Sequence, residues 1–122
     1  MGAVHDRIVS EVLAWPEVTQ APHRFGGVEF QFHGSELGHL HGDRLADLPF
    51  PKRVRDELIA AGRAQPHHVV PDSGWVSRWI RGPEDVEEVV KLFRMQYERL
   101  FARLERAEEQ RMRRSGTHAG QA

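Results

Sequence analysis

The segment from Ser35 to Pro51 reads SELGHLHGDRLADLPFP, and its pattern shapes the expected fold more than any other stretch of the chain. Its first residue, Ser35, follows Gly34, and a Gly-Ser pair is typical of a tight hairpin turn. The alternation after that turn predicts a strand with Leu37, His39 and His41 on one face and Glu36, Gly38 and Leu40 on the other. Residues 42–50 are predicted to form a loop that closes on Pro51.

Two predicted hairpins and three predicted helices make up the expected fold. Residues 28–33 alternate as a strand before the Gly34 turn, and residues 67–70 and 75–81 form a second strand pair around the turn residues 71–74. Apolar residues at helical spacing predict helices over 4–15, 51–61 and 83–111. The expected order is α-β-β-α-β-β-α. It describes a two-layer α+β fold, with helices packed on one face of a four-stranded antiparallel sheet.

The last helix is expected to be longer than the sheet. The chain of 122 residues is predicted to form one domain over residues 1–112, with a polar, disordered tail over 113–122. A helix of about 29 residues spans roughly 43 Å, which exceeds a sheet of this size. Leu100, Phe101 and Leu104 would then project into water. Because the apolar residues keep heptad spacing as far as Ala107, we expect residues 97–107 to join two copies in a homodimer.

Composition and charge exclude several classes of site. The chain has no cysteine, so disulfides, thiolate nucleophiles and zinc–thiolate sites are excluded. Its formal net charge of −1 provides no general attraction for nucleic acid, which is therefore the least expected partner. No apolar run is long enough for a membrane span, and charged residues precede any apolar run at the N-terminus. The protein is expected to be cytoplasmic, without a membrane partner.

Four short motifs lie along the chain: HRFGG at residues 23–27, ELGHLHG at 36–42, DLPFP at 47–51 and SGWVS at 73–77. Together they resemble the luciferase-like domain family, over roughly residues 15–99. Most members of that family are uncharacterised bacterial and fungal proteins, so the resemblance implies an α+β fold and not an activity. The layout is also similar, more weakly, to YjbR-like and frataxin-like proteins, in which helices cover one face of an antiparallel sheet.

The pair His39 and His41 is the sharpest chemical feature of the sequence. Strand residues two positions apart point the same way, about 6.5–7 Å apart along the strand. Their imidazoles can therefore share a divalent metal with a third ligand, His67 or His68. Glu36 is expected on the opposite face. Alternatively, the two histidines hydrogen-bond Asp43 or Asp47 and hold the loop in place.

A polar site is expected where the His39–His41 segment meets the Trp75–Arg81 hairpin. Trp75 and Trp79 can stack on a ring or cover the sheet beneath a helix, and Arg78 and Arg81 can bind an anion. The candidate binding residues are His23, Arg24, Glu29, His39, His41, Asp47, His68, Trp75, Ser77 and Arg81. The candidates for general acid–base catalysis are His39, His41 and His68.

Three functions fit these residues. The leading one is a small cytosolic module that binds a small-molecule ligand at the polar site. The second is a small enzyme that uses His39 and His41 as metal ligands or as a general acid–base pair. The third is a nucleic-acid-binding module that uses the hairpin and the basic end of the last helix.

Overall fold

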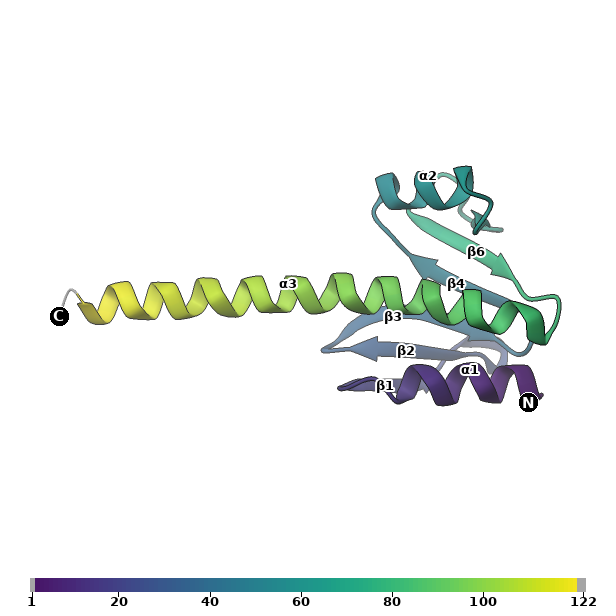
Figure 1. Ribbon diagram of the computed structural model, residues 1–122, viewed down its shortest axis with the longest axis horizontal. Coiled ribbons are helices and arrows are strands. Elements are labelled where there is room, and N and C mark those ends of the chain that lie inside the picture. Colours follow the sequence, from purple (N-terminus) through teal and green to yellow (C-terminus); the bar gives the residue numbers. More distant parts are fainter. Residues whose placement is uncertain (1, 121–122) are drawn as a thin grey trace.

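The computed structural model describes residues 2–120, which form a six-stranded sheet with two helices across one face (Figure 1). In chain order the elements are α1 (Ala3–Leu13), β1 (Val18–Pro22), the 3-10 turn η1 (Arg24–Gly26), β2 (Val28–Phe32), β3 (Ser35–His41), β4 (Leu45–Pro49), α2 (Lys52–Ala60), β5 (Gln65–Pro66), β6 (Trp75–Trp79), the 3-10 turn η2 (Pro83–Asp85) and α3 (Val86–Gly120). The strand order is β1-β2-β3-β4-β6-β5, and every neighbouring pair is antiparallel. The predicted α+β class, antiparallel sheet and long C-terminal helix are confirmed.

The prediction of four strands in the order α-β-β-α-β-β-α is wrong, because β1 and β4 are additional strands. β1 ends in Pro22 and lies at the sheet edge, where proline is tolerated, so its sequence reads as a turn. β4 occupies the stretch predicted to be a loop. Four of its five residues are buried, so it lacks the alternation of a strand with one exposed face.

The predicted strand over residues 67–70 is also wrong. Only Gln65 and Pro66 pair with β6, and the chain turns at His67. The Nδ1 atom of His67 accepts hydrogen bonds from the backbone N–H groups of Val69 and Val70, at 3.1 and 3.2 Å. This local bond holds the backbone in a turn and replaces the partner that a strand would need. The two valines therefore gave a misleading strand signal.

A β-bulge in β3 changes which side chains share a face. Phe30 pairs with Gly38, but the next residue of β2, Gln31, pairs with Glu36. Leu37 is the extra residue, and its side chain is fully buried in the core. The prediction that Leu37 and His39 share a face is therefore wrong. The same irregularity brings Glu36 within hydrogen-bond distance of His39.

The hydrophobic core lies between the sheet and the pair formed by α1 and α3 (Figure 1). Phe93 of α3 packs edge-on against Phe30, with ring centroids 5.2 Å apart. Tyr97 lies 5.1 Å from Phe32 and 5.4 Å from Trp15, and its hydroxyl donates a hydrogen bond to the carbonyl of Pro16. α2 lies at the edge formed by β5 and β6 (Figure 1). The side of the sheet away from α1 and α3, called the open face below, is left for polar side chains.

α3 extends well past the sheet, as predicted (Figure 1). The expectation that Leu100 and Leu104 lie in water is wrong: Leu100 is buried and Leu104 packs against the core. Phe101 is 39% exposed although its ring lies 6.2 Å from that of Phe32. The end of β2 therefore reaches further under the helix than the sequence indicates.

The segment predicted to be a disordered tail, residues 113–122, is helical as far as Gly120, and residues 121–122 lie outside the described part of the chain. An ion pair between Glu109 and Arg113, at 3.6 Å and helical spacing, supports this last part of α3. Across residues 2–120, none of the helices is both long enough and apolar enough to span a lipid bilayer.

Gly38→Ala is expected to destabilise the protein by about 3 kcal/mol or more, because two separate costs add. The φ angle of Gly38 is +150°, and a Cβ there would lie 2.6 Å from the carbonyl oxygen of Asp47 and 3.0 Å from Phe93. Gly34→Ala is the matched control, since Gly34 has a φ of +80° but open space around it. Urea denaturation should show a loss of only about 1 kcal/mol for the control. Equal losses in the two variants would contradict the close packing at Gly38.

The homodimer through residues 97–107 stays a prediction, now centred on Phe101, the exposed aromatic side chain of that segment. Phe101→Glu should convert a dimer to a folded monomer with little change in thermal stability, because the side chain is partly in solvent. Sedimentation velocity at tens of micromolar measures this. If the unmutated protein sediments as a monomer, the dimer is refuted.

Candidate functional site

The polar side chains of the open face converge on one carboxylate, that of Asp47 in β4. Strand pairing brings them together, because His39 lies opposite Asp47 and Asp47 lies opposite Ser77. Residues directly opposite each other in an antiparallel sheet point to the same face. Three adjacent strands therefore contribute a histidine, an aspartate and a serine to a single row.

Three imidazole nitrogens surround one oxygen of this carboxylate. The Nε2 atoms of His39, His41 and His67 lie 3.3, 3.2 and 3.6 Å from Oδ2 of Asp47. The Asp47 side chain is only 1% exposed, and its Oδ2 atom accepts no hydrogen bond within the described structure. A buried carboxylate oxygen without a partner is costly. The four atoms therefore have the composition and placement of a donor set for a cation.

Contacts behind these atoms fix their orientation. The Nδ1 atom of His39 lies 2.8 Å from Oε2 of Glu36, which turns the Nε2 atom toward Asp47. The hydroxyl of Ser77 donates a 2.6 Å hydrogen bond to Oδ1 of Asp47. Both contacts leave the inward-facing atoms, His39 Nε2 and Asp47 Oδ2, available. Supporting bonds of this type orient the ligands in metal centres.

Ser77 orients Asp47 and is not arranged as a nucleophile. Its Oγ atom lies 3.1 Å from Nδ1 of His68, but its hydrogen is directed to Asp47. The serine thus lies between the histidine and the aspartate. In a nucleophilic triad the histidine lies between the other two and takes the proton of the serine.

Further aromatic side chains lie beside these groups. The polar cluster, as the term is used below, consists of Glu36, His39, His41, Asp47, His67 and Ser77. The ring of His23 stacks on that of His39 with centroids 3.8 Å apart, and the Nδ1 atom of His23 lies 3.2 Å from Glu29. The ring of Trp75 lies 5.3 Å from His39. His23, His39 and His41 also have ligand atoms within 4.8 Å of one another, as do Asp47, His67 and His68. The two groups are adjacent, because His39 and His41 of the first lie 3.3 and 3.2 Å from Asp47 of the second.

The structure brings most of the predicted binding residues together and leaves two apart. Those in or beside the cluster are His23, Glu29, His39, His41, Asp47, His68, Trp75 and Ser77. No hydrogen bond or ion pair within residues 2–120 links Arg24 or Arg81 to them. The Arg81 side chain is 81% exposed, and its Nε atom lies 3.9 Å from the carboxylate of Asp85, which also pairs with Arg78.

Two members of the cluster are not identified correctly by the sequence, His67 and Glu36. His67 appears there only as an alternative to His68, because neighbours on a strand face opposite ways. Residues 67–70 form a turn, so both histidines reach Asp47. Glu36 is assigned to the wrong face because the bulge leaves no mark in a single sequence. Proline at positions 66 and 71 is the signal that favours a turn.

Proton binding within the cluster differs from one histidine to the next. Burial alone would lower the pKa of His39, but Asp47 and Glu36 outweigh it and raise that pKa to about 9. Burial, with the charge on His39, lowers the pKa of His41, and burial also lowers the pKa of His67. Burial would raise the pKa of Asp47, but its contacts with His39 and Ser77 lower it. At neutral pH the cluster therefore holds a carboxylate, one imidazolium and two neutral imidazoles.

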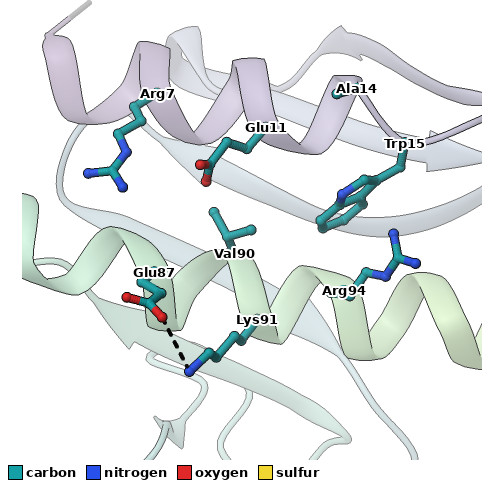
Figure 2. Close-up of a pocket in the computed structure, with 8 residues that line it drawn as sticks. All are labelled: Arg7, Glu11, Ala14, Trp15, Glu87, Val90, Lys91 and Arg94. Atoms are coloured by element: carbon teal, nitrogen blue, oxygen red, sulfur yellow. Dashed lines mark ion pairs between the residues drawn. The ribbon is translucent and has the colours of Figure 1, made fainter.

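A larger hollow lies on the other side of the sheet, between α1 and α3 (Figure 2). Its volume is about 610 Å³, against about 460 Å³ for the hollow beside His41 and His68. Figure 2 shows Val90 between the two helices and Trp15 beside Arg94, whose guanidinium lies 5.2 Å from the indole. Glu87 pairs with Lys91 at 3.6 Å. Because these charges lie at the surface, whereas Asp47 is buried among several imidazoles, we place the candidate site on the open face.

A model of a family described as the luciferase domain matches residues 34–96. The match runs from the turn before β3 into the first third of α3, and it contains Asp47, His39, His41 and His67. No curated protein and no solved structure matches the chain.

The metal-free protein is expected to lose stability as the pH rises from 6.5 to about 9. The pKa of His39 is about 9 in the folded protein and 6.5 when unperturbed, so its stabilising charge is fully present below 6.5 and is lost as the pH rises through about 9. The urea concentration at the midpoint of unfolding, measured with a chelator present, should therefore be lower at a pH of about 9 than at pH 6.5.

His39→Gln, which cannot take up a proton, should flatten this dependence. His33→Gln is the matched control, because His33 lies at the surface beside Glu17, and it should keep the slope. An unmutated protein whose midpoint does not change over the interval would contradict the charge assigned to His39.

Proposed function

Since the chain belongs to the luciferase domain family, and membership of a family defines a fold more securely than a chemistry, we propose its function from the geometry of the polar cluster. The protein binds one divalent transition-metal ion through His39, His41, His67 and Asp47, and it uses that ion to bind a small ligand.

The observation that carries this proposal is the spacing around Asp47. An ion that holds nitrogen and oxygen ligands tetrahedrally at about 2.0–2.2 Å separates those ligand atoms by about 3.4 Å. The three Nε2–Oδ2 separations are 3.2, 3.3 and 3.6 Å. Direct N–H···O hydrogen bonds have a most common length of about 2.9–3.0 Å. The spacing of the three nitrogens from Oδ2 therefore fits atoms that share an ion, and it is longer than the most common hydrogen bond.

Charge and orientation support the same proposal. A divalent cation compensates the buried carboxylate of Asp47, which carries its charge with little access to water. The lowered pKa values of His41 and His67 keep these imidazoles neutral, which is the form that binds metals. Two proton changes accompany binding: His39 releases the proton that its raised pKa holds, and the hydrogen on Nε2 of His67 moves to Nδ1. The second change breaks the hydrogen bonds that Nδ1 of His67 accepts from the backbone of Val69 and Val70. The contact between Glu36 and the Nδ1 atom of His39 is typical of metal-bound histidines.

The donor set narrows the class of metal. Three imidazoles and one carboxylate, without sulfur, suit zinc, iron(II), cobalt(II), nickel(II) or manganese(II). Four protein ligands fill a tetrahedral site, so a small ligand would bind by expanding the coordination of the ion to five. The more exposed histidine side chains are those of His41, at 28%, and His68, at 38%, so a ligand can approach from that side. This arrangement suits a ligand-binding or Lewis-acid centre.

Proton transfer by His39 without a metal is a second candidate, favoured by its raised pKa of about 9. Its side chain is 10% exposed, and both ring nitrogens already face carboxylates, those of Glu36 and Asp47. A substrate would therefore have to displace one of these partners. The metal centre needs no such displacement, and we prefer it.

The full chain, stripped with a chelator and titrated with zinc or cobalt(II), is expected to bind one ion per chain and to melt at a higher temperature when loaded. His41→Ala and His67→Ala should each weaken binding by about 100-fold or more. Glu36→Gln should weaken it about 10- to 100-fold, because it only orients His39. Isothermal titration calorimetry and elemental analysis measure both effects.

His33→Ala is the matched control, because His33 lies at the surface beside Glu17. It should bind metal as the unmutated protein does. Two results would refute the metal centre: no uptake by the unmutated chain, or an equal loss of affinity in the His33 and His67 variants.

A further inference from the structure

A hollow on the open face opens directly beside the polar cluster. Its volume is about 460 Å³, and His41 and His68 form the side nearest to Asp47. The turn over residues 42–44 lines another side, and Phe25 and Trp79 also line the hollow. Any small molecule that reaches the proposed ion from the side of His41 would pass through this space.

Phe25 is placed there at a cost to the fold. Its side chain is 97% exposed, and its backbone has a φ of +58°, a region that is unfavourable for bulky residues. It gains no burial that would offset this strain. Strained residues of this kind cluster at ligand sites, where the strain serves binding. The exposure and strain of Phe25 therefore point to a contact with a molecule outside the chain.

Trp79 is the second exposed aromatic side chain that lines the hollow. It is the last residue of β6, opposite Leu45, and it is 47% exposed. Its indole lies 6.2 Å from the ring of His68, which also lines the hollow. Two exposed aromatic side chains thus line the same small hollow, and both lack the burial that their area would favour.

The hollow is lined by one basic and one acidic side chain, Arg44 and Asp43. Arg44 lines it and is exposed, and no ion pair within residues 2–120 involves this residue. The one carboxylate of the lining, Asp43, accepts a 2.7 Å hydrogen bond from the backbone N–H of His5. The arginine charge is therefore available to a ligand, whereas the aspartate is partly engaged.

We propose that this hollow binds the apolar body of a small anionic ligand, in contact with Phe25 and Trp79, with its oxygen head group directed at the ion of the polar cluster. This inference rests on the proposed function for the role of the head group. The hollow itself is defined by Phe25, Trp79 and Arg44, none of which belongs to the proposed donor set. The chemical class is a carboxylate or hydroxamate attached to an apolar group.

The test uses the full chain loaded with cobalt(II), whose visible spectrum changes when a ligand binds. Benzohydroxamate should bind at least about tenfold more tightly than acetohydroxamate, because the two share a head group and differ in the apolar body. Phe25→Ala and Trp79→Ala should remove most of this preference without changing the cobalt content. Phe101→Ala is the matched control, because Phe101 is an exposed phenylalanine on the projecting helix, and this variant should keep the preference for benzohydroxamate.

The experiment can refute the ligand-binding role of the hollow and the metal centre separately. Normal cobalt uptake with equal affinity for the two hydroxamates overturns the hollow and leaves the metal centre. If cobalt does not bind, amide and indole NMR shifts in the metal-free protein still test the hollow: benzohydroxamate should shift Gly26, Gly42 and Trp79. Absence of those shifts overturns the inference.

Phe25→Gly should also raise or maintain the melting temperature, because glycine accepts a positive φ, and a clear loss would assign Phe25 a folding role instead.

Discussion

One buried carboxylate in the middle of a sheet constrains the rest of this protein. Asp47 lies in β4 between β3 and β6, and its side chain is almost completely removed from water. A buried charge is tolerated only when other groups compensate it. Here the compensating groups are imidazoles and one hydroxyl that come from both neighbouring strands and from the turn after β5. The arrangement of the open face follows from that requirement.

The two faces of the sheet carry different kinds of side chain and contribute differently to stability. The face under α1 and α3 carries the phenylalanine and leucine side chains of the core, and it supplies the burial that stabilises the fold. That contribution allows the open face to hold a polar cluster around a buried charge. The strands hold His39, His41 and Asp47 on a rigid frame, whereas His67 and Phe25 come from connecting segments that can adapt to a ligand.

Part of the site could be predicted from the sequence because it depends only on local geometry. His39 and His41 are two positions apart on one strand, and this spacing places them on the same face whatever they pair with. The convergence of that strand with Trp75 and Ser77 also follows from the short links of a small antiparallel sheet. The role of β4 could not be predicted, because a strand buried on both faces carries no alternation and its polar residue reads as part of a turn.

The sequence by itself determined the α+β class, the long C-terminal helix and the histidine pair, since each depends on the spacing of residues close together in the chain. Tertiary structure alone decided that Asp47 is buried, that the bulge at Leu37 turns Glu36 toward His39, and that His67 reaches the same carboxylate. These positions depend on strand register and on backbone hydrogen bonds between distant segments. Such pairings are selected by packing of the whole sheet, and no local pattern encodes them.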